Sequence, residues 1–252
     1  MTDSSHHLAA IILAAGKGKR MQNFENVNKT ISLLGGKPMI QRIVDFMQKI
    51  NVEQIVVVVG YAKESIKDVL KHYTITYAEQ VEQLGTGHAV KVALEALQPS
   101  ITDVIVVYGD DAVLYSENNK DIISELITSH YKEQTAVTFL TIEQANPFGL
   151  GRIVRDADGH VVGIVEEKVA TDEQKKITEI NPGCFVFSRD FLNTYLDQVK
   201  KNEISGEYYL TDLIDLAQKN KQKIHAVRGG ALAWRGVNTK EELEEAEKFF
   251  HS

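Results

Sequence analysis

The sequence predicts an α/β fold in which a largely parallel sheet lies between layers of helices. Short apolar runs rich in β-branched residues recur along the chain, which is typical of strands that helices cover on both faces. Segments with amphipathic helical spacing lie between several of these runs. A length of 252 residues suits one large domain. We therefore expect a single layered α/β domain over residues 1–252.

The apolar runs set the expected strands, and the helices follow from the spacing of apolar residues between them. The segment 38–50 has one apolar face, and Pro38 suits its first helical position because proline needs no hydrogen-bonded N–H there. The segment 86–97 places Ala89, Val90, Ala93 and Leu97 on one face in the same way. The expected strands are 9–15, 54–59, 103–108, 135–140 and 184–187.

The second half of the chain has a different pattern. Apolar residues alternate on both sides of Asp158-Gly159 within residues 151–167, which predicts a β-hairpin with its turn at that pair. Residues 1–7, including His6 and His7, are expected to form a loose N-terminal end. The charged segment 240–252 is expected to form a C-terminal helix that packs back on the domain.

Composition excludes several classes of protein. A net charge of −7 argues against a nucleic-acid or anionic membrane partner, since both need a basic face. Cys184 is the only cysteine, so the chain has no internal disulfide and no cysteine metal cluster, which fits a reducing cytoplasm. The N-terminus lacks the basic start and apolar stretch of a secretory signal, and no segment has membrane-spanning length. We expect a cytoplasmic protein whose partners are small molecules.

A glycine-containing turn follows the first apolar run and is the most informative local feature. Gly16 and Gly18 allow backbone conformations that can direct several N–H groups at one point, which is how a protein backbone binds phosphate. Lys19 and Arg20 add positive charge beside it. The turn matches neither the P-loop nor the dinucleotide-binding glycine pattern. Taken alone, it is also compatible with an ordinary surface turn.

Several further motifs follow this turn in a fixed order. Together they resemble the sugar nucleotidyltransferases, and most closely the uridyltransferase part of the bacterial N-acetylglucosamine-1-phosphate uridyltransferases. The likeness covers about residues 8 to 246. The motifs are LAAGKGKRM (13–21), GGKPMIQRIVDF (35–46), EQLGTGHAV (82–90), YGDD (108–111), GRIV (151–154), GIVEEK (163–168), EINPG (179–183), GEYYLTD (206–212) and GVN (236–238).

The resemblance implies a fold and a reaction. The fold is a three-layer, Rossmann-like nucleotidyltransferase sandwich with a mostly parallel mixed sheet and a small β-hairpin insertion on the substrate side. The reaction is Mg²⁺-dependent transfer of a uridylyl group from UTP to a sugar 1-phosphate, most simply N-acetylglucosamine 1-phosphate, with release of pyrophosphate. The larger members continue into an acetyltransferase domain, and we expect that second activity to be absent here.

The resemblance also assigns roles to residues of this sequence. Arg20 and Lys29 are the expected catalytic cations, and Asp110 and Asn238 the expected Mg²⁺ ligands. Asp110 ends an expected strand, where α/β sheets place ligand groups. The expected nucleotide-binding residues are Leu13, Ala14, Ala15, Gly16, Gly18, Gln80, Gln83, Gly85 and Thr86. The expected sugar-binding residues are Tyr108, Gly151, Glu166 and Asn181.

Several positions depart from the family pattern and keep alternatives open. Asn28 stands where the family usually has proline, and Asp111 where it has an apolar residue. Trp234 and Arg235 precede GVN in place of a shorter pair, and Pro182 replaces threonine. These differences leave open another nucleotide or acceptor phosphate, or a binding protein with little turnover. The oligomeric state is left open.

Overall fold

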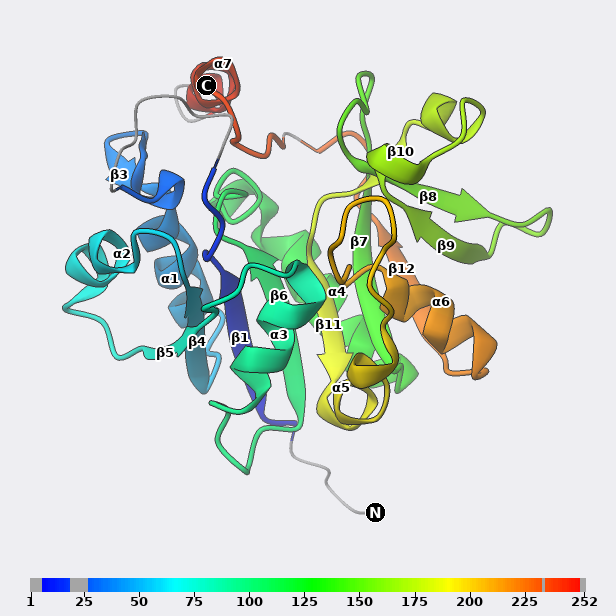
Figure 1. The fold of residues 1–252 in the computed structure, drawn as a ribbon, viewed down its shortest axis with the longest axis horizontal. Helices are drawn as coiled ribbons and strands as arrows, with labels where there is room; N and C mark the ends of the chain where they lie inside the picture. The colour runs from blue at the N-terminus through cyan, green and yellow to red at the C-terminus, as the bar shows by residue number, and fades with distance from the viewer. Residues whose placement is uncertain (1–5, 19–26, 233, 250–252) are drawn as a thin grey trace. The chain divides into compact units, whose positions relative to one another are not determined.

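The computed structural model describes residues 6–18, 27–232 and 234–249. The chain divides into two compact units, and each combines strands with helices (Figure 1), which confirms the α/β class. The first unit comprises residues 1–83, 89–120 and 233–252, and the second comprises residues 84–88 and 121–232. The expectation of a single domain stays a prediction.

The first unit is built on a parallel sheet with the strand order β5-β4-β1-β6. Alternate residues of a strand point to opposite faces, yet nearly every residue of β1, β4 and β6 is buried. Both faces of the sheet are therefore covered, as the continuous apolar runs predicted. The strands are β1 (Leu8–Leu13), β4 (Gln54–Val59), β5 (Thr76–Glu79) and β6 (Asp103–Tyr108).

The helices around this sheet match two of the predicted segments closely. The predicted helix at 38–50 begins at Met39 instead, because Pro38 is extended (ψ 134°) and pairs with Leu33. The helix predicted over 86–97 ends at Leu94, so Leu97 is buried beyond its end. The elements are η1 (Lys29–Ile31), β2 (Leu33–Leu34), β3 (Lys37–Pro38), α1 (Met39–Lys49), α2 (Lys63–Leu70), α3 (Thr86–Leu94), η2 (Glu117–Asn119) and α7 (Lys240–Lys248).

The second unit has a mixed sheet. Strand β7 pairs in parallel with β12 and antiparallel with β10 and β11, while β8 and β9 form an antiparallel hairpin. The strands are β7 (Val137–Glu143), β8 (Gly151–Arg155), β9 (Val161–Val165), β10 (Glu179–Asn181), β11 (Phe185–Ser188) and β12 (Ile224–Arg228). The helices are α4 (Lys120–Glu133), η3 (Glu167–Val169), η4 (Gln174–Lys176), α5 (Arg189–Tyr195), η5 (Leu196–Gln198) and α6 (Asp212–Lys219).

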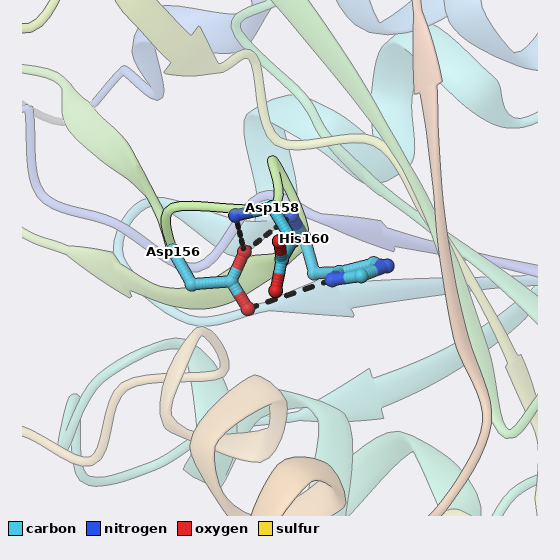
Figure 2. A group of neighbouring side chains, drawn as sticks. All are labelled: Asp156, Asp158 and His160. Carbon is cyan, nitrogen blue, oxygen red and sulfur yellow. Dashed lines mark hydrogen bonds and ion pairs between the residues drawn. The ribbon is translucent and has the colours of Figure 1, made fainter.

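The predicted hairpin is confirmed, including its turn. The Asp156 carboxylate accepts hydrogen bonds from the N–H groups of Asp158 at 3.0 Å and His160 at 2.8 Å (Figure 2). Gly159 has a φ of +83°, which glycine adopts without strain. The carboxylate and the glycine together determine where the chain reverses.

The N-terminal end differs from expectation where it is described. The N–H of His7 donates to Thr102 Oγ1 at 2.9 Å, and His7 Nδ1 lies 2.6 Å from Glu53 Oε1. His6 Nδ1 lies 3.1 Å from Asp103 Oδ2. These polar side chains hold His6 and His7 at the start of β1, and residues 1–5 lie outside the described residues. Along the described chain, no helix combines the length and apolar character needed to cross a bilayer.

Candidate active site

Three expected site residues meet in the first unit. The Lys29 ammonium group forms an ion pair with the Asp110 carboxylate and donates a hydrogen bond to Asn238 Oδ1 at 2.7 Å. Lys29 and Asp110 are only 12% and 17% exposed at the side chain, so water screens the pair little. One cation therefore bridges a carboxylate and an amide oxygen from distant parts of the chain.

Secondary structure explains why these residues meet. Asp110 follows β6 directly, at the carboxyl end of a parallel strand. The N–H of Val237 donates to the Asp110 carbonyl at 3.0 Å, which fixes the segment carrying Asn238. The N–H of Asn238 in turn donates to Glu242 Oε2 at 2.6 Å. Glu242 belongs to the capping box that begins α7, so the start of this helix holds Asn238 in place.

The loop that follows β1, residues 14–18, contains Gly16 and Gly18 and is called the glycine loop here. It lies against the same lysine. Gly18 has a φ of +60°, and a Cβ at this position would lie 3.2 Å from Lys29 Cδ. The N–H of Gly109 donates to the Leu13 carbonyl at 2.9 Å, and the N–H of Ala14 donates to the Val58 carbonyl at 2.9 Å. Residues 13–18 therefore continue β1 into a loop beside the Lys29 cluster. Lys19 and Arg20 lie outside the described residues, and their expected roles stay predictions.

Asp111 is buried behind the segment that carries Asn238. Its Oδ1 would lie 2.8 Å from a Cβ on Gly236, so any larger residue at position 236 would force the buried Asp111 carboxyl group to move. Burial, and next the charge of Asp110, raise the pKa of Asp111 well above its usual range. Oδ2 of Asp111 has no hydrogen-bond partner among the described residues. The side chain fills space behind the cluster in place of the apolar residue usual in the family.

The Arg235 guanidinium group lies against the C-terminal helix. It pairs with Glu242 and with Glu245 of α7, each at 3.1 Å. Trp234 is buried in the same segment. The two residues that depart from the family pattern before GVN therefore attach this segment to α7 and to the interior of the first unit.

In the second unit, two sequence blocks far apart in the chain bind each other. The N–H of Tyr208 donates to the Leu84 carbonyl at 2.8 Å, and the N–H of Gly87 donates to the Tyr208 carbonyl at 2.9 Å. Thr86 Oγ1 accepts a hydrogen bond from the Leu210 N–H at 2.9 Å. A Cβ on Gly85 would lie 2.6 Å from the Tyr208 carbonyl oxygen, so only glycine allows this approach. The segments 84–88 and 206–210 are thus held together by hydrogen bonds.

Three expected sugar-binding residues also come together in the second unit. Asn181 on β10 pairs with Gly151 on β8, and a Cβ on Gly151 would lie 3.5 Å from Glu166 Oε1. Asn181 Oδ1 accepts from the Gly183 N–H at 2.9 Å, and its Nδ2 group donates to the Leu140 carbonyl at 3.4 Å. The structure therefore places these three residues side by side, and their role in sugar binding stays a prediction.

Glu166, Asp212 and Asp215 are three carboxyl groups of the second unit with raised pKa values. Burial raises the pKa of Glu166, and the Thr211 hydroxyl donates a hydrogen bond to its Oε1 at 3.0 Å. Burial, and next the charges of Asp215 and Glu166, raise the pKa of Asp212 to about 6. Burial also raises the pKa of Asp215. This part of the second unit therefore holds more protons at mildly acidic pH than an unfolded chain would.

The remaining expected ligand-binding residues lie in the first unit. Gln80 is buried, and its N–H donates to the Val59 carbonyl at 2.8 Å. Gln83 is exposed. Tyr108 ends β6 opposite Leu13, beside the glycine loop.

Asp156, Asp158 and His160 bring three possible metal-binding side chains together in the β8–β9 turn (Figure 2). All three are exposed, and Asp156 already accepts two hydrogen bonds that form the turn. The turn explains the cluster, and we assign no metal to it.

Sequence reasoning missed three residues that support the predicted site. Asn28 appeared only as a departure from the family pattern, yet it is fully buried beside the glycine loop. Glu242 holds Asn238, and Thr211 binds Glu166. The Thr239–Glu242 spacing is a capping-box signal that could have revealed Glu242. The contacts of Asn28 with Ala14 and Tyr61 and of Thr211 with Glu166 join distant parts of the chain, so no local pattern predicts them.

Comparison with known proteins places this chain in a family. A sequence profile of the nucleotidyl transferase family matches residues 9–252. The chain belongs to the nucleotidyl transferase family. The match includes the glycine loop and the segments that carry Lys29, Asp110 and Asn238.

Proteins named "Bifunctional protein GlmU" are similar to this nucleotidyl transferase. The protein from Thermoanaerobacter pseudethanolicus is 42% identical over 241 residues, which are 96% of this chain and 51% of the relative. The protein from Neisseria gonorrhoeae is 43% identical over 247 residues, which are 97% of this chain and 52% of the relative. The protein from Clostridium novyi is 40% identical over 240 residues, which are 95% and 51% of the two chains. This chain spans about half the length of the curated relatives it matches.

Proposed function

We propose that this chain transfers a uridylyl group from UTP to a sugar 1-phosphate, with N-acetylglucosamine 1-phosphate as the expected acceptor. An oxygen of the sugar phosphate attacks the α-phosphorus of UTP, and the bond between that phosphorus and the bridging oxygen of pyrophosphate breaks. The products are a UDP-sugar and pyrophosphate. Membership of the nucleotidyl transferase family supports the reaction class.

The observation that carries the proposal is the Lys29–Asp110–Asn238 cluster beside the glycine loop. Both substrates are anions, and the transition state gathers further negative charge at the α-phosphorus. Such a reaction needs positioned countercharge more than it needs a protein nucleophile. Lys29 supplies a largely buried cation next to backbone suited to phosphate. A protein that only bound nucleotide would have no need for a cation at the reacting phosphorus.

Asp110 and Asn238 would hold the Mg²⁺ ion that the proposal includes. Their oxygens already share one cation, the Lys29 ammonium group, so both can reach a common point. A carboxylate and an amide oxygen are hard ligands that suit Mg²⁺, which takes its remaining ligands from water and phosphate oxygens. When bound, the ion would neutralise charge on the triphosphate.

The protein groups divide the remaining work by position. The glycine loop would bind phosphate oxygens through its N–H groups, and Lys29 would balance charge at the α-phosphate. Arg20 is the proposed partner of the leaving pyrophosphate. Gln80, Gln83, Gly85 and Thr86 are the proposed contacts of the base and ribose. Gly151, Glu166 and Asn181 would accept or donate hydrogen bonds to the sugar.

A substrate panel tests the proposal. Pyrophosphate release is measured with UTP, CTP, ATP and GTP, each combined with N-acetylglucosamine, glucose and other sugar 1-phosphates, with Mg²⁺ and with EDTA. We expect the highest rate with UTP and N-acetylglucosamine 1-phosphate, and no turnover in EDTA. Preference for a purine nucleotide would contradict the base assignment. Nucleotide binding without turnover for any acceptor would favour a regulatory binding protein.

A further inference from the structure

Asn28 uses every polar atom of its buried side chain. Its Nδ2 group donates to the carbonyl oxygens of Ala14 at 2.9 Å, Tyr61 at 3.0 Å and, at the longer distance of 3.4 Å, Gly16. Its Oδ1 accepts from the Thr30 N–H at 3.0 Å and from the Thr30 hydroxyl at 2.9 Å. Asn28 has no exposed surface, so these bonds replace water entirely. One side chain thus connects the glycine loop to the turn that carries Lys29.

These bonds determine the direction of two peptide groups in the loop. The described chain has no cis peptide bond, so each N–H points opposite to the carbonyl of the same peptide group. Because the carbonyls of Ala14 and Gly16 point toward Asn28, the N–H groups of Ala15 and Lys17 point away from it. Successive N–H groups of a turn that face one point form the kind of concavity that binds anions, and Gly18, at a φ of +60°, gives this loop a turn conformation.

We infer that Asn28 is a positioning residue that orients the 14–18 loop for the phosphates of a nucleoside triphosphate. This inference rests on the proposed function. Asn28 binds the loop carbonyls, whose oxygens would otherwise repel an anion, and so turns them away from the phosphate. The N–H groups on the other side of the loop remain available to the phosphate. As the N-cap of η1 it also fixes the backbone from which Lys29 extends. One residue thereby couples the phosphate loop to the reacting cation.

The hydrogen bonds of this chain use both the donors and the acceptor of asparagine at this place. Aspartate has the same shape and keeps the acceptor for Thr30, but it lacks the Nδ2 donors and would set negative charge against carbonyl oxygens. Proline, which the family pattern favours here, offers neither a donor nor an acceptor on its side chain. This chain therefore orients the loop through a side chain at a position where its sequence departs from the family pattern.

The test compares Asn28→Asp with the unmodified protein by calorimetric titration of UTP and of pyrophosphate in Mg²⁺. We expect both dissociation constants to rise at least about tenfold, because the variant loses the buried hydrogen bonds from Asn28 Nδ2 to the loop carbonyls. The KM for the sugar 1-phosphate should stay within about twofold, because its proposed contacts lie elsewhere. The loss should shrink as the pH falls, because burial raises the pKa of the introduced carboxyl group and a protonated aspartate regains one donor.

Ser65→Ala is the matched control. Ser65 Oγ accepts from the Asn28 N–H at 3.1 Å and donates to the Ala62 carbonyl at 2.7 Å, which lies outside the glycine loop. We expect it to bind UTP normally. If both variants lose affinity in proportion to their loss of unfolding free energy, or if Asn28→Asp binds UTP normally, the inference is wrong. If the unmodified protein binds neither UTP nor pyrophosphate, the proposed function fails, and this inference with it.

A second measurement needs no variant and covers the case in which Asn28→Asp does not fold. Amide ¹H–¹⁵N spectra of the unmodified protein are recorded while pyrophosphate is added with Mg²⁺. We expect the Ala15 and Lys17 amide protons to move to higher frequency on binding, because they would donate to phosphate oxygens. Binding of pyrophosphate without a change at these two amides would overturn the inference.

Discussion

Lys29 is the side chain on which the proposed chemistry depends most directly. We predict that Lys29→Met lowers kcat at least about 100-fold, because a countercharge at the reacting phosphorus is lost, while the dissociation constant of UTP changes little. Steady-state rates and calorimetric titration separate the two effects. Lys63→Met is the control, since Lys63 pairs with Glu79 at the surface as Lys29 pairs with Asp110 inside. Equal kcat for Lys29→Met and the control would contradict the assigned role.

Asp110 provides a second test at the same cluster. We predict that Asp110→Asn raises the Mg²⁺ concentration needed for half-maximal activity at least about tenfold, because an amide is a weaker ligand than a carboxylate. Activity measured across a Mg²⁺ titration gives this value. Asp45→Asn, which removes the ion pair with Lys37 and alters the hydrogen bond from the Tyr73 hydroxyl, should leave this concentration unchanged. An unchanged Mg²⁺ requirement for Asp110→Asn would remove Asp110 from the metal site.

The pairing of segments 84–88 and 206–210 shows how loops depend on one glycine. Gly85 has a φ of +105°, and its missing Cβ makes room for the Tyr208 backbone. We predict that Gly85→Ala lowers the free energy of unfolding by about 2–4 kcal/mol, since the backbone of Tyr208 must move. Gly159→Ala, at a φ of +83° with open space around it, should cost only about 1 kcal/mol.

Urea unfolding of both variants measures this difference. Gly159→Ala carries the strain of a positive φ without a contact, so it isolates the steric part of the Gly85 effect. Equal losses for the two variants would show that the approach to Tyr208 contributes nothing to stability.

The helix α6 begins with a carboxyl group that makes stability depend on pH. The pKa of Asp212 is raised to about 6, so the folded protein binds more protons than the unfolded chain between about pH 4 and pH 6. Its contribution to stability is therefore full at low pH and is lost as pH rises through about 6. We predict that Asp212→Asn makes the fall in the free energy of unfolding between low and high pH smaller by roughly 1 kcal/mol. The effect is no larger because water screens a half-buried carboxyl group.

Urea unfolding at about pH 4.5 and pH 7.5 checks this prediction. The neighbouring groups are Asp215 and Glu166, which raise the pKa, and Lys219, which lowers it. Asp190→Asn, at the start of α5, is the control because it lies on another helix of the second unit. If Asp212→Asn keeps the full pH dependence of the unmodified protein, the raised pKa has no influence on stability.

For the molecule as a whole, ligand binding should appear as stability. A ligand that binds only the folded protein stabilises it by about 2.7 kcal/mol at 100 times its dissociation constant. We predict that UTP with Mg²⁺ raises Tm by several degrees, and that ATP and GTP at equal concentration raise it less, because a purine overfills a pyrimidine site. Thermal unfolding at fixed protein concentration measures the shifts. A larger shift with ATP would contradict the base assignment.

Much of the fold could be predicted because its signals are local. Continuous apolar runs located β1, β4 and β6, since strands covered on both faces have no polar side. The pair Asp158-Gly159 located a turn, since glycine tolerates a positive φ. The strands β5, β10 and β12 were missed because they are short and only partly apolar, and pairing with a neighbouring strand makes them strands.

The candidate site divides in the same way. The sequence by itself determined the family motifs, the glycine loop and the position of Asp110 after a strand, because spacing along the chain carries each of them. Only the tertiary structure decided that Lys29 binds Asn238, 209 residues away, and that Thr86 binds the backbone of Leu210, 124 residues away. It also turned Arg235 toward α7 and placed Asn28 beneath the glycine loop. The partner of a side chain depends on which distant segments the sheet brings next to it. A pattern of neighbouring residues does not contain this information.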